Sequence, residues 1–197
     1  KNSKHGFKMK DRLKDYVLVI PNVITQSLCK KILKEIETVK WKPHTFYYHE
    51  TREEKNVSPG HESEYSFSEI KSQEILKKKV WKAIHTYILE YLNFKWFPGW
   101  DGFSPIKFNR YNKNKFMKEH ADTIKSIFDG ERRGIPILSI IGALNHNYEG
   151  GELVLFQDTE YRLKAGEVLI FPSNFMYPHQ VMPVTKGTRF TYTSWVY

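Results

Sequence analysis

Apolar and polar residues alternate along this chain with two different periods, which divide it into a first half that favours helices and a second half that favours strands. In the first half, two segments repeat apolar residues every three or four positions, as amphipathic helices do. One predicted helix begins after Thr25, a typical capping residue, and runs to about Lys40. The other runs from about Glu69 to Leu92. The residues expected to face the core are Leu28, Ile32, Ile36 and Val39 in the first helix and Leu76, Val80, Ala83, Ile84, Tyr87, Ile88 and Tyr91 in the second.

The second half, from Ile106 onward, consists of short runs rich in β-branched and aromatic residues with turn residues between them, which is typical of strands. The last run extends from Thr188 to Tyr197. Because neighbouring side chains of a strand point to opposite faces, this run presents two different surfaces. Arg189, Thr191, Thr193, Trp195 and Tyr197 would share one face, and Phe190, Tyr192, Ser194 and Val196 the other.

The predicted fold class is mainly β with flanking helices. We expect a barrel of the jelly-roll or double-stranded β-helix type, with the N-terminal helices packed against one face. A further strand is predicted at 16–20. The polar segment 42–67 is predicted to be an irregular or hairpin insertion, and 94–105 an aromatic loop. Each is a candidate wall or lid over a site, or else a solvated loop, and the pattern leaves both interpretations open.

Composition narrows the class of protein. The chain has 197 residues, 40% of them hydrophobic, which suits one domain over 1–197. No stretch approaches the roughly 18 apolar residues of a membrane span, so no membrane partner is expected. Cys29 is the single cysteine, which excludes an internal disulfide and favours a reducing, cytoplasmic location. The net charge of +9 suits an acidic peptide or a nucleic acid, or simply a solvated basic surface.

Four polar residues of the second half carry the candidate chemistry. His120 and Asp122 are two residues apart, so an extended backbone would point both side chains to one side. His179 follows 57 residues after Asp122, and Arg189 ten residues after His179. Two imidazoles and one carboxylate form the ligand set of a facial triad, which binds non-haem Fe(II) and leaves the opposite face open. An arginine nearby offers what an anionic co-substrate needs.

Further motifs surround these four residues, and together they resemble the iron(II)- and 2-oxoglutarate-dependent dioxygenases, in particular their prolyl 4-hydroxylase-like branch. The resemblance covers roughly 104–197, the expected catalytic core, whereas 1–100 is expected to provide helical support and an insertion. The motifs that carry it are Tyr111 and Phe116 ahead of His120-Ala121-Asp122, Gly150-Gly151-Glu152-Leu153, the run from Gly166 to Pro172, His179-Gln180-Val181, Lys186-Gly187-Thr188-Arg189, and Trp195 six residues after the arginine.

The resemblance implies a role for each residue. His120, Asp122 and His179 would hold Fe(II), and Arg189 would pair with the far carboxylate of 2-oxoglutarate. The implied reaction uses O2 and 2-oxoglutarate, releases succinate and CO2, and hydroxylates a substrate C–H bond. Ascorbate is a candidate further cofactor. The remaining expected site residues are Tyr111, which would hydrogen-bond the same carboxylate, and Trp195 and Thr191, which would line the pocket.

The substrate is the open question at this stage. A prolyl residue in a peptide or protein is the first expectation, with a nucleic-acid demethylase or a hydroxylase of free amino acids as alternatives. The basic charge favours nucleic acid, but Trp195 stands where the demethylases have a second arginine. A non-catalytic binding module with the same fold conflicts with the presence of all four residues of the pattern.

One residue departs from the family pattern. Asn114 occupies a position where many relatives have glycine, and asparagine tolerates the left-handed backbone conformation that such a turn requires. Five other histidines carry no motif and are interpreted as structural; they are His44, His49, His61, His85 and His146.

Overall fold

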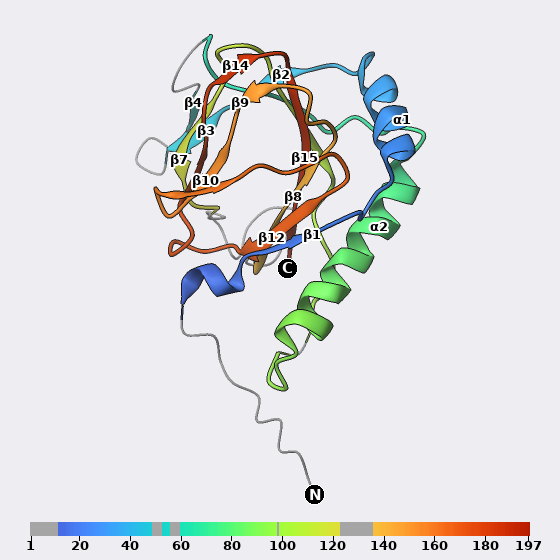
Figure 1. Cartoon of the computed structure of the whole chain (residues 1–197), viewed down its shortest axis with the longest axis vertical. Helices are drawn as coiled ribbons and strands as arrows, with labels where there is room; N and C mark the ends of the chain where they lie inside the picture. The colour runs from blue at the N-terminus through green and yellow to red at the C-terminus, as the bar shows by residue number, and fades with distance from the viewer. Residues whose placement is uncertain (1–11, 49–52, 56–59, 98, 123–135) are drawn as a thin grey trace, which may run out of the picture.

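The computed structural model describes residues 12–48, 53–55, 60–97, 99–122 and 136–197. In this part of the chain, two helices lie along one side of a large antiparallel sheet (Figure 1). The fold is mainly β with two helices, as predicted. No helix in the described ranges is long and apolar enough to cross a bilayer.

The large sheet carries most of the polar residues of the site. Its strand order is β1-β12-β8-β15-β6-β5-β2, and each neighbouring pair is antiparallel. The strands are β1 (Leu18–Ile20), β2 (Lys42–Pro43), β5 (Glu64–Ser66), β6 (Lys107–Tyr111), β8 (Leu138–Ala143), β12 (Val168–Pro172) and β15 (Arg189–Val196).

A smaller antiparallel sheet, in the order β11-β10-β13-β7, faces the large one. Its strands are β7 (Met117–His120), β10 (Leu153–Leu155), β11 (Thr159–Tyr161) and β13 (His179–Val181). Two short ladders pair β14 (Val184–Lys186) with β9 (Glu149–Gly150) and β3 (Phe46–Tyr48) with β4 (Glu53–Lys55). Among the described strands no pair joins the two main sheets into one closed barrel, so the double-stranded β-helix stays a prediction.

Helix α1 (Gln26–Ile36) begins where predicted, because the Thr25 hydroxyl accepts a hydrogen bond from the Leu28 backbone N–H at 3.2 Å. It ends earlier than the predicted Lys40. The core positions expected for this helix are borne out, with Ile32 and Ile36 fully buried and Leu28 and Val39 partly buried.

Helix α2 (Gln73–His85) continues as a π-helix, η2 (Thr86–Leu92). The predicted start at Glu69 is wrong, because Ser72 donates its backbone N–H and its hydroxyl to the Glu35 carboxylate of α1, at 2.9 and 3.0 Å. A short 3-10 helix, η1 (Leu13–Tyr16), takes the first residue of the strand predicted at 16–20, which leaves β1 shorter than expected.

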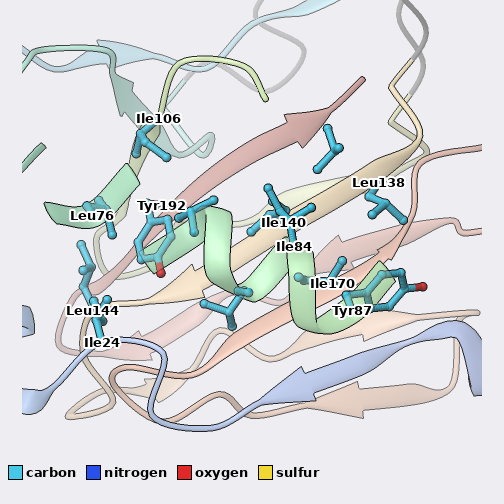
Figure 2. Close-up of a cluster of buried hydrophobic side chains, with 14 of the residues drawn as sticks. Ile24, Leu76, Ile84, Tyr87, Ile106, Leu138, Ile140, Leu144, Ile170 and Tyr192 are labelled. Carbon is cyan, nitrogen blue, oxygen red and sulfur yellow. The ribbon is translucent and has the colours of Figure 1, made fainter. Parts of the chain in front are cut away.

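Two apolar cores lie on the two faces of the large sheet. The core under the helices contains the predicted positions of α2 and η2 together with Ile140, Ile170 and Tyr192 of the sheet (Figure 2). Gly142 makes room for the Tyr192 ring, because a Cβ at this position would lie 2.0 Å from the ring. The second core lies between the sheets, where Ile141 and Phe171 meet Leu155 and Val181. The face of β15 that begins with Arg189 points toward this second core, as the alternation of its residues predicts.

The segment 42–67 contributes to the large sheet. The prediction of an irregular segment is wrong for 64–66, which form β5 beside β6, while β3 and β4 form the hairpin that was the second alternative. The loop 94–105 packs Phe94, Phe97, Trp100 and Phe103 against the helix-side core, where the ring centroids of Trp100 and Trp81 are 5.1 Å apart, whereas Trp96 is exposed. These aromatic residues therefore support the helices rather than cover the polar site.

Candidate metal centre

His120 and His179 are brought together by the pairing of β7 with β13, in which they are direct cross-strand partners. Their ring centroids are 4.4 Å apart. Each ring is held in the same way: Nδ1 of His120 lies 2.7 Å from the backbone oxygen of Lys118, and Nδ1 of His179 lies 3.1 Å from that of Tyr177. A carbonyl oxygen only accepts, so each Nδ1 carries the proton and each Nε2 carries the lone pair that can bind a metal.

Asp122 follows the end of β7, and both Nε2 atoms face its carboxylate. Its Oδ1 lies 3.6 Å from Nε2 of His120 and 3.8 Å from Nε2 of His179. The three potential ligand atoms all lie within 4.8 Å of one another. Two neutral imidazole nitrogens and one carboxylate oxygen at this spacing fit the facial ligand set for Fe(II) that the sequence predicts.

The other carboxylate oxygen of Asp122 is held by the large sheet. Ser139 of β8 donates its hydroxyl to Oδ2 at 2.7 Å, and the Trp195 side chain on β15 lies close enough to help lower the pKa of this carboxyl group. Ser139 and Trp195 are cross-strand partners, so one register position of the large sheet orients a residue from the smaller sheet. The Ser173 hydroxyl donates to the backbone oxygen of Asp122 at 3.2 Å and fixes the main chain there. Such outer partners orient metal ligands.

The electrostatic surroundings favour the metal-binding protonation states. Burial, followed by the charge of His179, lowers the pKa of His120 to about 4. Burial alone would raise the pKa of Asp122, but the two histidines and the hydrogen bonds outweigh it and lower that pKa. At neutral pH the imidazole of His120 is therefore neutral and Asp122 is ionised, which are the forms that bind a metal cation.

Arg189 and Tyr111 form a second polar group at the opposite end of the β15 face. They are cross-strand partners, and the guanidinium carbon of Arg189 lies 4.9 Å from the centre of the Tyr111 ring. Arg189 is only 3% exposed, and its buried Nε has no hydrogen-bond partner among the described residues. Burial raises the pKa of the Tyr111 hydroxyl, so this group keeps its proton and acts as a donor. The pair is therefore suited to a carboxylate.

Gly151 gives the Arg189 side chain its space. Its φ of +66° lies in the left-handed region, and a Cβ would come within 3.1 Å of Cδ of Arg189 and 2.9 Å of Cγ2 of Val184. Asn114 has a φ of +68°, which confirms that it adopts the left-handed conformation. Its backbone N–H donates to the Val184 oxygen at 2.7 Å, so the turn is kept without glycine.

Comparison with known proteins shows which families the part of the chain with these residues is similar to. A family model described as the 2OG-Fe(II) oxygenase superfamily matches residues 106–197. Residues 106–197 are therefore similar to this superfamily. A PKHD-type hydroxylase of Idiomarina loihiensis is 34% identical over 94 residues, which are 46% of this chain and 41% of that protein. One from Shewanella oneidensis is 39% identical over 100 residues, which are 48% of this chain and 43% of that protein. The chain thus spans about two fifths of the length of these relatives.

Solved structures show that the similarity in fold extends beyond residues 106–197. A prolyl hydroxylase from Trichoplax adhaerens, in complex with a peptide fragment of the hypoxia inducible factor oxygen degradation domain, has a TM-score of 0.69 at 16% identity, covering 93% of this chain and 84% of its own. A viral collagen prolyl hydroxylase from Paramecium bursaria Chlorella virus-1, solved with 2OG, has a TM-score of 0.66 at 16% identity, covering 92% and 94%. At these identities the likeness concerns the fold.

Trp195 and Thr191 lie on the face of β15 that contains Arg189, as predicted. Trp195 is partly exposed and contacts the carboxyl group of Asp122. Thr191 is 1% exposed and is the cross-strand neighbour of Asn109 on one side and of Ala143 on the other. Thr191 therefore lies between Arg189 and Trp195 on the inner face of β15, and its role in the pocket stays a prediction.

Sequence reasoning missed several residues around this centre. Ser139 gave no signal because a serine within an apolar strand carries no motif. His44 was interpreted as structural, yet it lies close enough to Lys107, His120 and Asp122 to sense their charges. Burial and the charges of Lys107 and His120 lower its pKa to about 3, so it is neutral at physiological pH.

Three other histidines, His61, His85 and His146, fit their structural interpretation. His146 accepts a hydrogen bond from the Ala165 backbone N–H at 3.1 Å and supports a turn. His85 is exposed on α2, and His61 packs its ring 6.3 Å from Phe116. His49 lies outside the described residues.

Proposed function

We propose that this protein is an Fe(II)- and 2-oxoglutarate-dependent dioxygenase that hydroxylates a prolyl residue of a peptide or protein and releases succinate and CO2. The observation that carries the proposal is the convergence of His120, Asp122 and His179 in one cluster, with Arg189 on the facing sheet. The superfamily match over 106–197 and the resemblance to PKHD-type hydroxylases support it.

The metal would be held by Nε2 of His120, Nε2 of His179 and the Asp122 carboxylate. When bound, Fe(II) supplies the activation of O2 and the oxidative decarboxylation of 2-oxoglutarate from which the hydroxyl group comes. The protein contributes the geometry: two backbone carbonyls fix the histidine tautomers, and Ser139 and Trp195 fix the rotation of the carboxylate.

The co-substrate would be oriented by Arg189 and Tyr111. The buried guanidinium of Arg189 provides charge-assisted hydrogen bonds in a place that excludes water, where they are stronger than at the surface. The protonated Tyr111 hydroxyl adds a neutral donor to the same carboxylate. Gly151 keeps the approach to Arg189 open because it lacks a Cβ. Ascorbate, the other cofactor that the resemblance suggests, stays a prediction.

The substrate class rests on the likeness to prolyl hydroxylases and on Trp195. Two solved proteins with this fold are a prolyl hydroxylase in complex with a peptide fragment and a viral collagen prolyl hydroxylase. A nucleic-acid demethylase and a hydroxylase of free amino acids remain the alternatives. Turnover of 2-oxoglutarate in the presence of prolyl peptides, free proline or methylated oligonucleotides separates the three, and stimulation by oligonucleotides alone would exclude the prolyl substrate.

We further infer that 1–197 forms one domain with a double-stranded β-helix at its centre. The two facing sheets and the shared inter-sheet core support a jelly-roll arrangement, and α1 and α2 cover the outer face of the large sheet. Limited proteolysis tests the single domain: helical and sheet parts that separate into stable fragments would contradict it.

The decisive experiment is an anaerobic titration of the Fe(II)-loaded protein with 2-oxoglutarate, followed by visible absorption. We expect a saturable charge-transfer band that is lost in Asp122→Ala. A folded protein that binds iron and gives no band would show that the co-substrate is a different compound, and the proposed function would be wrong.

A further inference from the structure

Lys107 is a cation at the edge of the proposed metal centre. Neither metal binding nor co-substrate binding, as proposed above, gives this residue a role. It is the first residue of β6 and shares the inner face of the large sheet with Tyr111, four residues further on. Its cross-strand partner is Thr193, which is two residues before Trp195. Lys107 therefore lies toward the Trp195 end of this face, whereas Tyr111 and Arg189 mark the other end.

Two aromatic rings hold the Lys107 ammonium group. Its Nζ lies 5.6 Å from the centre of the Tyr65 ring and 5.3 Å from the centre of the Trp195 ring. Both distances are within the range of a cation–π interaction. The rings from β5 and β15 restrict the Lys107 side chain and displace part of its hydration shell. Ligand binding would therefore cost less conformational entropy at this side chain.

Lys107 lies far from the proposed co-substrate site at Arg189 and Tyr111 and close to the metal centre. Four residues of extended strand correspond to about 13 Å between Lys107 and Tyr111, whereas a five-carbon diacid is only roughly 6 Å long. Trp195, which Lys107 contacts, lies close enough to the Asp122 carboxyl group to help lower its pKa. The positive charge of Lys107 also contributes to the lowered pKa values of His44 and His120, after burial as the main cause.

We propose that Lys107, held between Tyr65 and Trp195, binds a carboxylate of the prime substrate next to the C–H bond that is hydroxylated. This proposal rests on the proposed function, since it names the substrate class of the same site: an acidic side chain close to the target proline. A lysine ammonium is a compact charge that suits one anionic group. Nucleic-acid binding sums several phosphate contacts, and Lys107 contributes a single cation, so an acidic peptide fits better.

The test uses three blocked peptides of equal length with a central proline flanked by glutamate, glutamine or lysine. Dissociation constants are measured by anaerobic calorimetry on protein loaded with Fe(II) and 2-oxoglutarate. We expect the glutamate peptide to bind about tenfold more tightly than the glutamine peptide, the effect of one charge-assisted hydrogen bond. In Lys107→Met, which keeps an unbranched chain between the two rings, this ratio should fall to about one. In Lys107→Glu the preference should reverse toward the lysine peptide.

Two control variants separate recognition from packing and from overall charge. Lys107→Arg keeps a cation between the rings and should keep the preference. Lys78→Gln removes one positive charge from an exposed position on α2 and should also keep it. A purely structural role for Lys107 would change stability without changing the ratio between peptides, and would overturn the proposal.

A further arm identifies the source of the carboxylate. Free proline and prolinamide differ only in the α-carboxylate, so a Lys107-dependent preference for proline over prolinamide, without one among the peptides, would place the carboxylate on a free amino acid and overturn the acidic-peptide assignment. If the Lys107 variants change binding only of oligonucleotides and not of peptides, Lys107 binds a phosphate rather than a carboxylate, and the proposal is wrong.

The 2-oxoglutarate titration distinguishes this proposal from the proposed function. We expect the charge-transfer band and the affinity for 2-oxoglutarate to be the same in Lys107→Met as in the wild type. If Lys107→Met instead loses affinity for 2-oxoglutarate to the same extent as affinity for the glutamate peptide, Lys107 serves the co-substrate and the proposal is wrong. If the wild type gives the band but binds no peptide or does not discriminate among them, this inference fails alone. Absence of the band in the wild type would overturn both.

Discussion

Arg189 of β15 and Tyr111 of β6 are cross-strand partners, and the guanidinium carbon of Arg189 lies 4.9 Å from the centre of the Tyr111 ring. The ring packs against one side of the guanidinium, whose buried Nε has no hydrogen-bond partner among the described residues. The co-substrate site that we propose is therefore built by the register of two neighbouring strands rather than by a loop, and its geometry depends on the large sheet remaining intact.

Replacement of Arg189 tests this co-substrate site. In Arg189→Ala we expect the dissociation constant of 2-oxoglutarate to rise at least about 30-fold, the effect of removing one partner of a buried charge pair. In Tyr111→Phe, which removes one neutral donor, we expect a rise of about fivefold. Iron affinity should change little in either variant. The measurement is the 2-oxoglutarate titration of the charge-transfer band, and a variant that loses iron while keeping 2-oxoglutarate affinity would contradict these roles.

The support of Asp122 by the large sheet leads to a graded prediction. Asp122→Ala should abolish iron-dependent turnover, because it removes one of the three ligands. Ser139→Ala removes only the hydroxyl that donates to Oδ2 at 2.7 Å, and should weaken iron binding by about tenfold. Competition with a chelator of known affinity gives both values. Equal iron affinity in Ser139→Ala and the wild type would show that Trp195 alone is sufficient to orient the carboxylate.

Gly151→Ala should damage the co-substrate site without touching the ligands. The added Cβ would meet Cδ of Arg189 and Cγ2 of Val184, so Arg189 must shift. We expect weaker binding of 2-oxoglutarate together with lower stability. Gly60→Ala is the matched control, because Gly60 also has a positive φ but a Cβ there meets no atom of the described residues within 4 Å. It should lose about 1 kcal/mol of unfolding free energy from backbone strain and keep its 2-oxoglutarate affinity.

Stability of the helix-side core should depend on the contact between Gly142 and Tyr192. A Cβ at position 142 would lie 2.0 Å from the Tyr192 ring, so Gly142→Ala should lower the free energy of unfolding by about 3 kcal/mol. The buried Tyr192 hydroxyl has no hydrogen-bond partner in the described part of the structure, so Tyr192→Phe should leave stability unchanged or raise it slightly. Urea unfolding measures both, and a clear loss in Tyr192→Phe would reveal a partner for the hydroxyl.

Cys29 should respond to alkaline pH in a characteristic way. Burial raises the pKa of its thiol from 9.0 to about 11. Below pH 9 the thiol is neutral in both the folded and the unfolded states, so its contribution to stability is fully present. Between pH 9 and 11 the unfolded thiol ionises first, and this contribution is lost by up to about 1.4 kcal/mol per pH unit. The difference in unfolding free energy between the wild type and Cys29→Ala should therefore shrink over this range. Iodoacetamide should also modify the native thiol far more slowly than the unfolded one at pH 9, and equal rates would contradict the burial.

The sequence by itself determined the local structure around the site and its candidate ligands. The period of two in β15 predicted that Arg189, Thr191 and Trp195 share a face, because strand geometry alone sets that alternation. The hydroxyl at Thr25 predicted the start of α1, because capping involves only the next few residues. The spacing of His120 and Asp122 likewise predicted a shared direction. Their roles as ligands, with His179, stay predictions until metal binding is measured.

Only the tertiary structure decided which distant residues surround these groups. The start of α2 depends on the Glu35 carboxylate of another helix, and the position of 64–66 depends on pairing with β6. Ser139, His44 and Lys107 carry no local signal, since a serine, a histidine or a lysine in isolation is compatible with many environments. They acquire their significance from strand register and from charges contributed by separate elements. Local periodicity is a property of neighbouring residues, whereas a site is formed by contacts between residues far apart in the chain.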